Sequence, residues 1–113
     1  MSIRDESFYA LLERFSAATP TPGGGSAAAL VGSVAASLVA MVAGLTLGKK
    51  SYQAVEPEMR RVLAEATKLR DELLELADRD SEAFNAVIAA YKLPKETESD
   101  RAAREQAIQA ALT

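Results

Sequence analysis

The chain has 113 residues, of which 49% are apolar, and a formal net charge of −3, so it is long enough for one domain with a core. It contains no cysteine and no histidine, which excludes disulfide frameworks, zinc-thiolate sites and histidine-based proton transfer. The acidic balance argues against general nucleic-acid binding, which needs a concentrated basic surface. Proton transfer would therefore use carboxylates, lysine, tyrosine or water. Because the N-terminal stretch has no apolar signal-peptide core, we expect a cytoplasmic protein.

The first expected helix covers residues 4–17, and Pro20 and Pro22 end it, because a residue before proline avoids helical dihedral angles. Its apolar residues share one stripe of an amphipathic helix. This stripe consists of Phe8, Leu11, Leu12 and Phe15.

The second expected helix begins after Ser26, a natural N-cap, and runs to about Leu47, with Gly48 just beyond its end. Residues 27–47 carry no charge and are long enough to cross a membrane. The alternative is a helix buried on all sides in a bundle or a dimer interface. We favour burial, since alanine, glycine and serine gain little from transfer into lipid.

The third expected helix starts at Pro57 and continues to Leu93, where Pro94 ends it. It would be about 50 Å long, more than a small domain needs unless it bends or pairs with another chain. Thr97 is expected to cap a fourth helix, whose apolar face begins just before the chain stops. The predicted fold is an all-α bundle with a central buried apolar helix and one long helix, completed by a partner subunit.

Asp80 is the residue that most strongly suggests chemistry, because its neighbours on the same helical face, such as Leu76 and Phe84, are apolar. A carboxylate facing a core is costly, and desolvation would raise its pKa toward a range useful for proton transfer. The structural alternative is that Asp80 pairs with a buried lysine or caps another segment. Both interpretations remain open at this point.

The segment TPTPGGGSAAA, residues 19–29, has a composition that suits a binding loop. Consecutive glycines allow close approach of a ligand, and a following helix would offer free N–H groups to an anion or carbonyl. A permissive loop between tightly packed helices is equally compatible. Lys49 and Lys50 at one helix end, and Lys92 and Lys95 at another, either neutralise helix dipoles or meet at one site for an anionic ligand tail.

Three segments together carry a family resemblance: TPTPGGGSAAAL, LTLGKKSY and DRDSEAFNAVIAAYKLPK. In this order and spacing they resemble the cyclodeaminase domain of formiminotransferase-cyclodeaminase and its bacterial stand-alone relatives, which include methenyltetrahydrofolate cyclohydrolases. The resemblance runs from about Phe8 to the C-terminus. It implies an all-helical, dimeric enzyme that acts on one-carbon derivatives of tetrahydrofolate and needs neither a metal nor another cofactor.

The resemblance also implies roles for particular residues. Asp80 matches the acidic residue of the family's D-x-x-A-F segment and would be the catalytic carboxylate. The Gly23, Gly24, Gly25 and Ser26 loop and Lys49 would line the folate site, and Lys95 would contribute to it. Family domains continue with further helices, so residues 1–113 are expected to form one domain truncated at its C-terminus.

The implied reaction is cyclodeamination of 5-formimino-tetrahydrofolate to 5,10-methenyl-tetrahydrofolate with release of ammonia. The alternative within the family is methenyltetrahydrofolate cyclohydrolase. Alternatives of other classes are a non-catalytic helical module for folate binding or dimerisation and a small membrane protein. The expected partners are a tetrahydrofolate derivative, with or without a polyglutamate tail, and a second copy of the chain, but no nucleic acid and no membrane.

Overall fold

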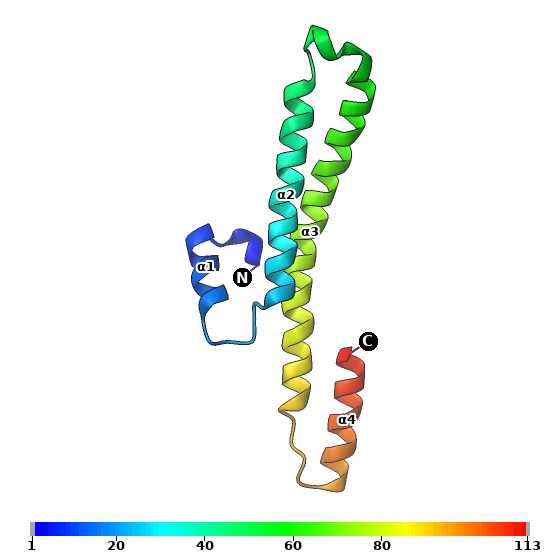
Figure 1. The fold of residues 1–113 in the computed structure, drawn as a ribbon. Helices are drawn as coiled ribbons and strands as arrows, with labels where there is room; N and C mark the ends of the chain where they lie inside the picture. The colour runs from blue at the N-terminus through cyan, green and yellow to red at the C-terminus, as the bar shows by residue number, and fades with distance from the viewer. Residues whose placement is uncertain (1, 113) are drawn as a thin grey trace.

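The computed structural model describes residues 2–112, and over this range the chain is helical with no strand (Figure 1). The predicted all-α class and the single long helix are therefore confirmed. The elements in chain order are the 3-10 helix η1 (Ile3–Asp5), α1 (Phe8–Ser16), α2 (Gly24–Thr46), the 3-10 helix η2 (Lys50–Val55), α3 (Glu56–Tyr91) and α4 (Glu98–Leu112).

Helices α2 and α3 form an antiparallel hairpin that gives the molecule its elongated shape of 74 × 28 × 18 Å (Figure 1). Two buried serines of α2 set its register. Ser26 donates a hydrogen bond to the carbonyl of Ala77 at 2.7 Å, and Ser33 donates to the carbonyl of Arg70 at 2.9 Å. The two bonds are seven residues apart on both helices, so they repeat after two helical turns.

Small residues let the two helices approach closely along the hairpin. Ala43 on α2 and Ala66 and Ala77 on α3 are buried between them. At Gly32, an added Cβ would lie only 3.2 Å from a methyl carbon of Leu73. The side chains of α2 that are buried in this contact are accordingly all small: Ser26, Ser33 and Ala43.

Within residues 2–112 the other side of α2 is not covered, so the expected burial on all sides would need the dimer interface that the sequence analysis allowed. The exposed stripe consists of five large apolar residues at spacings of three and four, each at least 50% exposed: Val31, Val34, Leu38, Met41 and Leu45. By length and composition α2 could cross a membrane, and only 11% of its apolar window is buried. However, α2 pairs along its length with α3, whose outer surface carries ion pairs such as Arg61–Glu65. Insertion of α2 into lipid would break that pairing or take charges with it.

The helix ends follow the sequence with two exceptions. The first is that the helix expected over residues 4–17 is divided, because the 3-10 helix η1 (Ile3–Asp5) precedes α1, which begins only at Phe8 after the N-cap Ser7. Gly48 has a φ of +80°, as a residue just beyond a helix end requires, and the Thr97 hydroxyl accepts a hydrogen bond from the Asp100 N–H at 3.0 Å. The expectation that Ser26 is an N-cap is wrong, because α2 already begins at Gly24 and Gly23 occupies the cap position. The Ser26 side chain points inward instead.

The N-terminal segment is tied to α3 by Asp78. The backbone N–H of Ile3 donates to Asp78 Oδ1 at 2.5 Å, the Ser2 hydroxyl donates to Oδ2, and Arg4 forms an ion pair with the same carboxylate at 3.5 Å. This anchor holds α1 beside the hairpin (Figure 1). At the far end, α4 folds back along α3, where Arg104 stacks over the Tyr91 ring and Ile108 is buried.

Candidate functional site

Asp80 lies on α3 at the level where α2 begins, directly against Gly25. A Cβ added at Gly25 would be 2.6 Å and 2.7 Å from the two carboxylate oxygens of Asp80 and 2.8 Å from its Cγ. Only a residue without a side chain therefore fits at position 25 while the carboxylate keeps this place. The structure thus brings together two features that are 55 positions apart in the sequence, the glycine loop and the candidate carboxylate.

The first turn of α2 presents backbone donors beside that carboxylate. The Ala27 N–H is bonded to the Gly23 carbonyl at 3.0 Å, which closes the first helical bond. Within residues 2–112, the N–H groups of Gly24, Gly25 and Ser26 have no hydrogen-bond acceptor. Gly24 and Gly25 are exposed. The arrangement places a negatively charged group next to a helix N-terminus that can also receive a carbonyl or an anion.

Side-chain hydrogen bonds hold the glycine loop against α3. The Thr21 hydroxyl donates to the side-chain oxygen of Asn85 at 2.7 Å, and Pro22 between Thr21 and the glycines is buried. On the inner side, the fully buried Ser26 hydroxyl lies 2.8 Å from that of Ser81 and 3.5 Å from Asp80 Oδ2. The side chain of Ser26 is thus buried in the interface between α2 and α3, where its hydroxyl is hydrogen-bonded.

Asp80 itself is exposed in this chain, in contrast to the desolvation expected from its apolar neighbours. Leu76 and Phe84, one turn before and one turn after it on the same face, are about half exposed as well. The expected apolar stripe exists, but nothing within residues 2–112 covers it. No lysine pairs with Asp80 in the described part of the chain. Asp80 lies beside the first turn of α2, but within residues 2–112 no backbone N–H of that helix donates a hydrogen bond to it, so it does not cap α2.

Within one chain, the two lysines expected to line the folate site lie away from the glycine loop. Lys49 follows the opposite end of α2, more than about 30 Å from Gly25 at 1.5 Å of rise per residue. Lys95 lies in the connection between α3 and α4, beyond a helical segment of about 16 Å that separates Asp80 from Tyr91. Within one chain, the two lysine clusters are at opposite ends of α3 and do not meet at one site.

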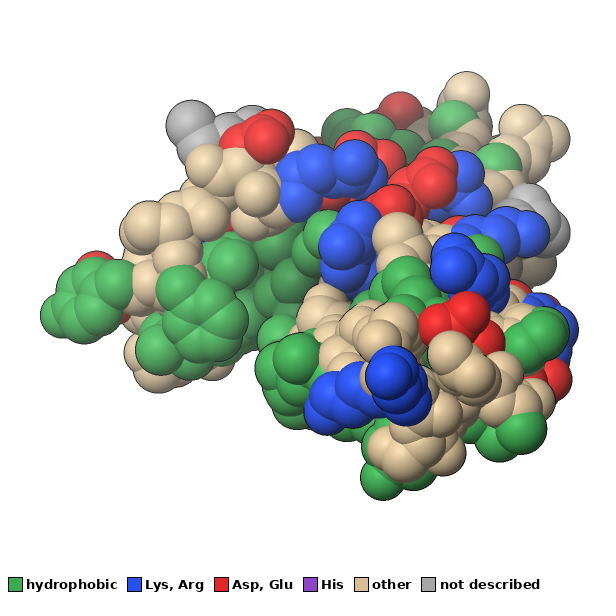
Figure 2. Space-filling model, turned by 90° about the horizontal axis from the view of Figure 1, so that it is seen from above, with side chains coloured by type: hydrophobic (Ala, Val, Ile, Leu, Met, Phe, Trp, Pro, Cys, Tyr) green, Lys and Arg blue, Asp and Glu red, His purple; other side chains and the backbone are tan. Residues whose placement is uncertain are grey.

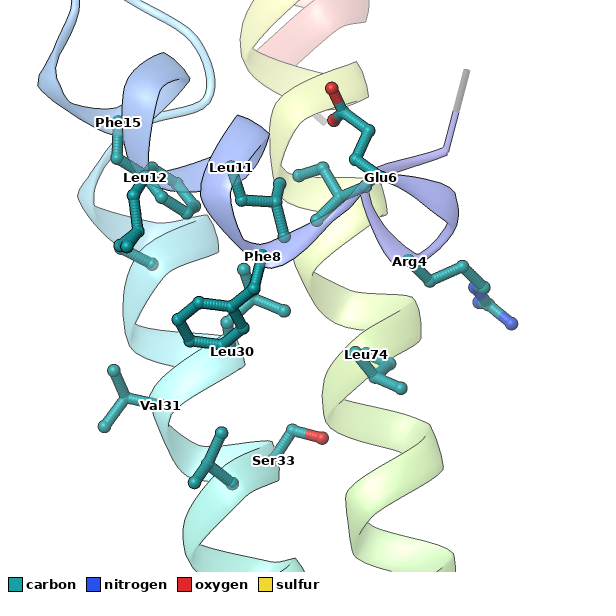
Figure 3. A pocket seen from close by; sticks show the side chains of 13 residues that line it. Arg4, Glu6, Phe8, Leu11, Leu12, Phe15, Leu30, Val31, Ser33 and Leu74 are labelled. Atoms are coloured by element: carbon teal, nitrogen blue, oxygen red, sulfur yellow. The ribbon is translucent and has the colours of Figure 1, made fainter.

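Asp80 lines neither of two sizeable hollows beside the N-terminal segment. The apolar one, of about 460 Å³, lies between α1 and the hairpin, as the close view shows (Figure 3). Apolar side chains line this recess on the surface as well (Figure 2). Its lining residues are Ile3, Arg4, Glu6, Phe8, Leu11, Leu12, Phe15, Ala27, Leu30, Val31, Ser33, Val34 and Leu74. The second hollow, of about 540 Å³, is polar and includes Asp78, Ser81 and Asn85.

Sequence reasoning missed the roles of Asp78, Ser81 and Asn85. The carboxylate of Asp78 anchors the N-terminus, a role that its place in the sequence does not indicate. Although partial burial raises the pKa of Asp78, hydrogen bonds from Ser2, the Ile3 backbone and Arg4 outweigh it and hold the pKa below its ordinary value of 3.8. Asn85 follows Ser81 by one helical turn, and this spacing was the available signal that both face the glycine loop.

Comparison with known proteins agrees with this arrangement. The sequence pattern of the formiminotransferase-cyclodeaminase family matches residues 7–113. Methenyltetrahydrofolate cyclohydrolase of Methylorubrum extorquens is 45% identical over 108 residues, which cover 96% of this chain and 52% of that protein. Formimidoyltransferase-cyclodeaminase of Rattus norvegicus is 36% identical over 98% of this chain and 20% of its own length.

The fold is similar to that of a solved relative. The crystal structure of formiminotetrahydrofolate cyclodeaminase from Thermotoga maritima superposes with a TM-score of 0.76 and 34% sequence identity, over 97% of this chain and 54% of that one. The all-helical fold and the sequence match together identify a cyclodeaminase-type domain. The chain belongs to the formiminotransferase-cyclodeaminase family, and it spans about half the length of the Methylorubrum and Thermotoga relatives.

Proposed function

We propose that this chain carries a folate one-carbon site that closes or opens the 5,10-methenyl ring of tetrahydrofolate, with Asp80 as its catalytic carboxylate. The observation that carries the proposal is the contact between Asp80 and Gly25 at the start of α2. It places a proton acceptor beside unpaired backbone donors. Family membership supports the substrate class, since the named relatives act on folates.

The first candidate reaction is cyclodeamination. In the protonated 5-formimino substrate, N10 attacks the formimino carbon, the new C–N10 bond closes a five-membered ring, and the bond to the departing nitrogen breaks. Asp80 accepts the proton from N10 and delivers it to that nitrogen, so ammonia leaves and the cationic methenyl ring remains. The carboxylate then stabilises the cation, and the glycine-loop amides orient the substrate so that its two reacting atoms stay together. No metal or further cofactor is needed for these steps.

The second candidate is methenyltetrahydrofolate cyclohydrolase, in which water adds to the methenyl carbon and 10-formyl-tetrahydrofolate forms. The 45% identity to a relative of that name favours it over the 36% identity to the rat enzyme. It requires the same stabiliser of the cation and an activated water molecule.

Absorbance of methenyl-tetrahydrofolate separates the two reactions in one cuvette. Formation from 5-formimino-tetrahydrofolate above the uncatalysed rate supports cyclodeamination, and faster loss of added methenyl-tetrahydrofolate supports the cyclohydrolase. Asp80→Asn is the matched control, because it keeps the shape of the side chain and removes its charge. Turnover that survives this substitution would contradict the assignment of Asp80, and binding of folate without any turnover would support a non-catalytic module.

We further propose that a second copy of the chain covers the exposed stripe of α2 in antiparallel orientation. The stripe has the three-and-four spacing of a helix–helix seam, and α2 carries no charge that would oppose self-association. Leu38 lies at the centre of the stripe, where the two-fold axis would pass. Each residue on one side of Leu38 would then face the residue at the same distance on the other side of Leu38 in the second copy, so that Val31 faces Leu45. Lys49 of a second copy would then lie level with Ala27, next to the glycine loop.

Cysteine cross-linking tests the pairing cleanly, because the chain has no cysteine of its own. Leu38→Cys should form a disulfide dimer under mild oxidation, since position 38 faces its own copy at the two-fold axis. Val31→Cys is the control and should form no disulfide dimer alone, yet cross-link when mixed with Leu45→Cys. Dimerisation through Val31→Cys alone would exclude the antiparallel arrangement.

A further inference from the structure

We propose that Ser81 is a positioning residue that acts through Ser26 to hold the first turn of α2 against Asp80. The inference rests on the proposed function for its catalytic consequence, but its structural part can be tested without substrate. Ser81 was not among the residues that the sequence analysis selected.

The hydrogen-bond inventory of Ser26 explains why Ser81 matters. The Ser26 hydroxyl is fully buried and has one proton, which it donates to the Ala77 carbonyl at 2.7 Å. Its oxygen must then accept from another donor, and the Ser81 hydroxyl at 2.8 Å is in place to supply that proton. Removal of the Ser81 hydroxyl would leave a buried oxygen without a donor, a state that proteins avoid.

The position of this serine pair determines what it controls. Ser26 is the third residue of α2 and directly follows Gly25, whose backbone lies against the Asp80 carboxylate. Ser81 directly follows Asp80 on α3. The hydrogen bond between the two hydroxyls therefore links the neighbour of Gly25 on α2 to the neighbour of Asp80 on α3. If the Ser26–Ser81 hydrogen bond is lost, the start of α2 is the first part of the hairpin to move. The distance between its backbone donors and Asp80 then changes.

Ser33 offers a matched control within the same interface. It is also a buried serine of α2 and also donates to a carbonyl of α3, that of Arg70 at 2.9 Å. It lies seven residues from Ser26, about 10 Å along the helix and away from Asp80. Ser33→Ala removes a comparable hydrogen bond, and both this variant and Ser81→Ala should lower the Tm by about 4–8 °C.

The decisive readout is amide hydrogen exchange of Ala27 in the unliganded chain, because its N–H closes the first turn of α2 onto Gly23. Ser81→Ala should accelerate this exchange about 5–30-fold, whereas Ser33→Ala should leave it near the wild-type rate. Ser81→Thr keeps the hydroxyl and should restore slow exchange. Equal effects of the two alanine variants on Ala27, or none from Ser81→Ala, would overturn the proposal.

Kinetics then test the catalytic consequence. Ser81→Ala should lower kcat about 10-fold at unchanged KM, as misplacement of a catalytic group does, while Ser33→Ala retains kcat. An unchanged kcat in a Ser81→Ala protein with accelerated Ala27 exchange would overturn the positioning role. If the wild-type chain turns over no folate while the exchange pattern is as expected, the proposed function fails and the structural role of Ser81 stands.

Discussion

Replacement of Gly25 by alanine should separate stability from activity. The new Cβ would lie 2.6–2.8 Å from three atoms of the Asp80 carboxylate, so one of the two side chains must move. Asp80 is exposed and can rotate, at a cost of about 0.5–1.5 kcal/mol for an unfavourable rotamer. Alanine in place of a helical glycine contributes about 0.5–1 kcal/mol of stability in the opposite direction. The two effects nearly cancel, so Gly25→Ala should unfold within about 1 kcal/mol of wild type.

The activity of Gly25→Ala should nevertheless fall, because its Asp80 carboxylate is displaced from the backbone donors. Gly24→Ala is the matched control, since a Cβ at position 24 meets no atom of the protein within 4 Å. We expect Gly24→Ala to keep kcat, with any change confined to KM, and to unfold at a higher urea concentration than wild type. Urea unfolding followed by circular dichroism and absorbance-monitored turnover provide the two measurements. Equal kcat values for Gly25→Ala and Gly24→Ala would refute the reasoning.

Three further substitutions test other parts of the structure. Asp80→Asn should abolish turnover without moving the urea midpoint, because the side chain is exposed and the hydrogen bond that it accepts from the Ser26 hydroxyl is long, at 3.5 Å; an unfolded variant would instead make Asp80 structural. Gly24→Val should weaken folate binding while helicity is retained, since its side chain fills the open space beside the first turn of α2; unchanged affinity would place the ligand elsewhere. Asp78→Asn should destabilise the chain at pH 7 and at pH 5, because the carboxylate holds Ser2, Ile3 and Arg4. The pKa of Asp78 is lower in the folded chain than its ordinary value of 3.8. The stabilisation that the Asp78 carboxylate provides is therefore complete above pH 3.8 and is lost as the pH falls through the folded-state pKa. The urea midpoints of wild type and Asp78→Asn should converge only below that pKa.

Much of the fold follows from the sequence because local signals dominate in a helical hairpin. Gly48 and Thr97 mark helix ends through backbone and side-chain chemistry that acts within four residues, and both were predicted correctly. Ser26 was misassigned as a cap because the same hydroxyl chemistry serves either a helix end or a neighbouring helix. Only the contact with Ala77 and Ser81, residues more than 50 positions away, decides between the two roles.

The candidate site was predictable in part for a related reason. The resemblance indicated that Asp80 and the glycine loop act together, and the structure places them in contact. The sequence also placed Lys49 just past the C-terminal end of α2, where the structure has it, but it could not indicate which other part of the molecule lies near that end. The exposure of Asp80 was likewise missed, since an apolar helical face predicts burial without specifying which chain provides it.

The exposure of Asp80 has a consequence for catalysis that links the site to assembly. A carboxylate in water is well solvated and shuttles protons poorly, whereas exclusion of water strengthens its interaction with a developing cation. Leu76 and Phe84 flank Asp80 and are half exposed in the single chain. Exclusion of water from the site therefore requires another helical segment that covers these two side chains. If a second copy provides that cover, specific activity should fall as the chain is diluted through the dissociation constant of the dimer. Asp80→Asn, in contrast, should be inactive at every concentration. Specific activity that is independent of dilution, in a chain shown to be monomeric by sedimentation, would mean that the exposed carboxylate suffices.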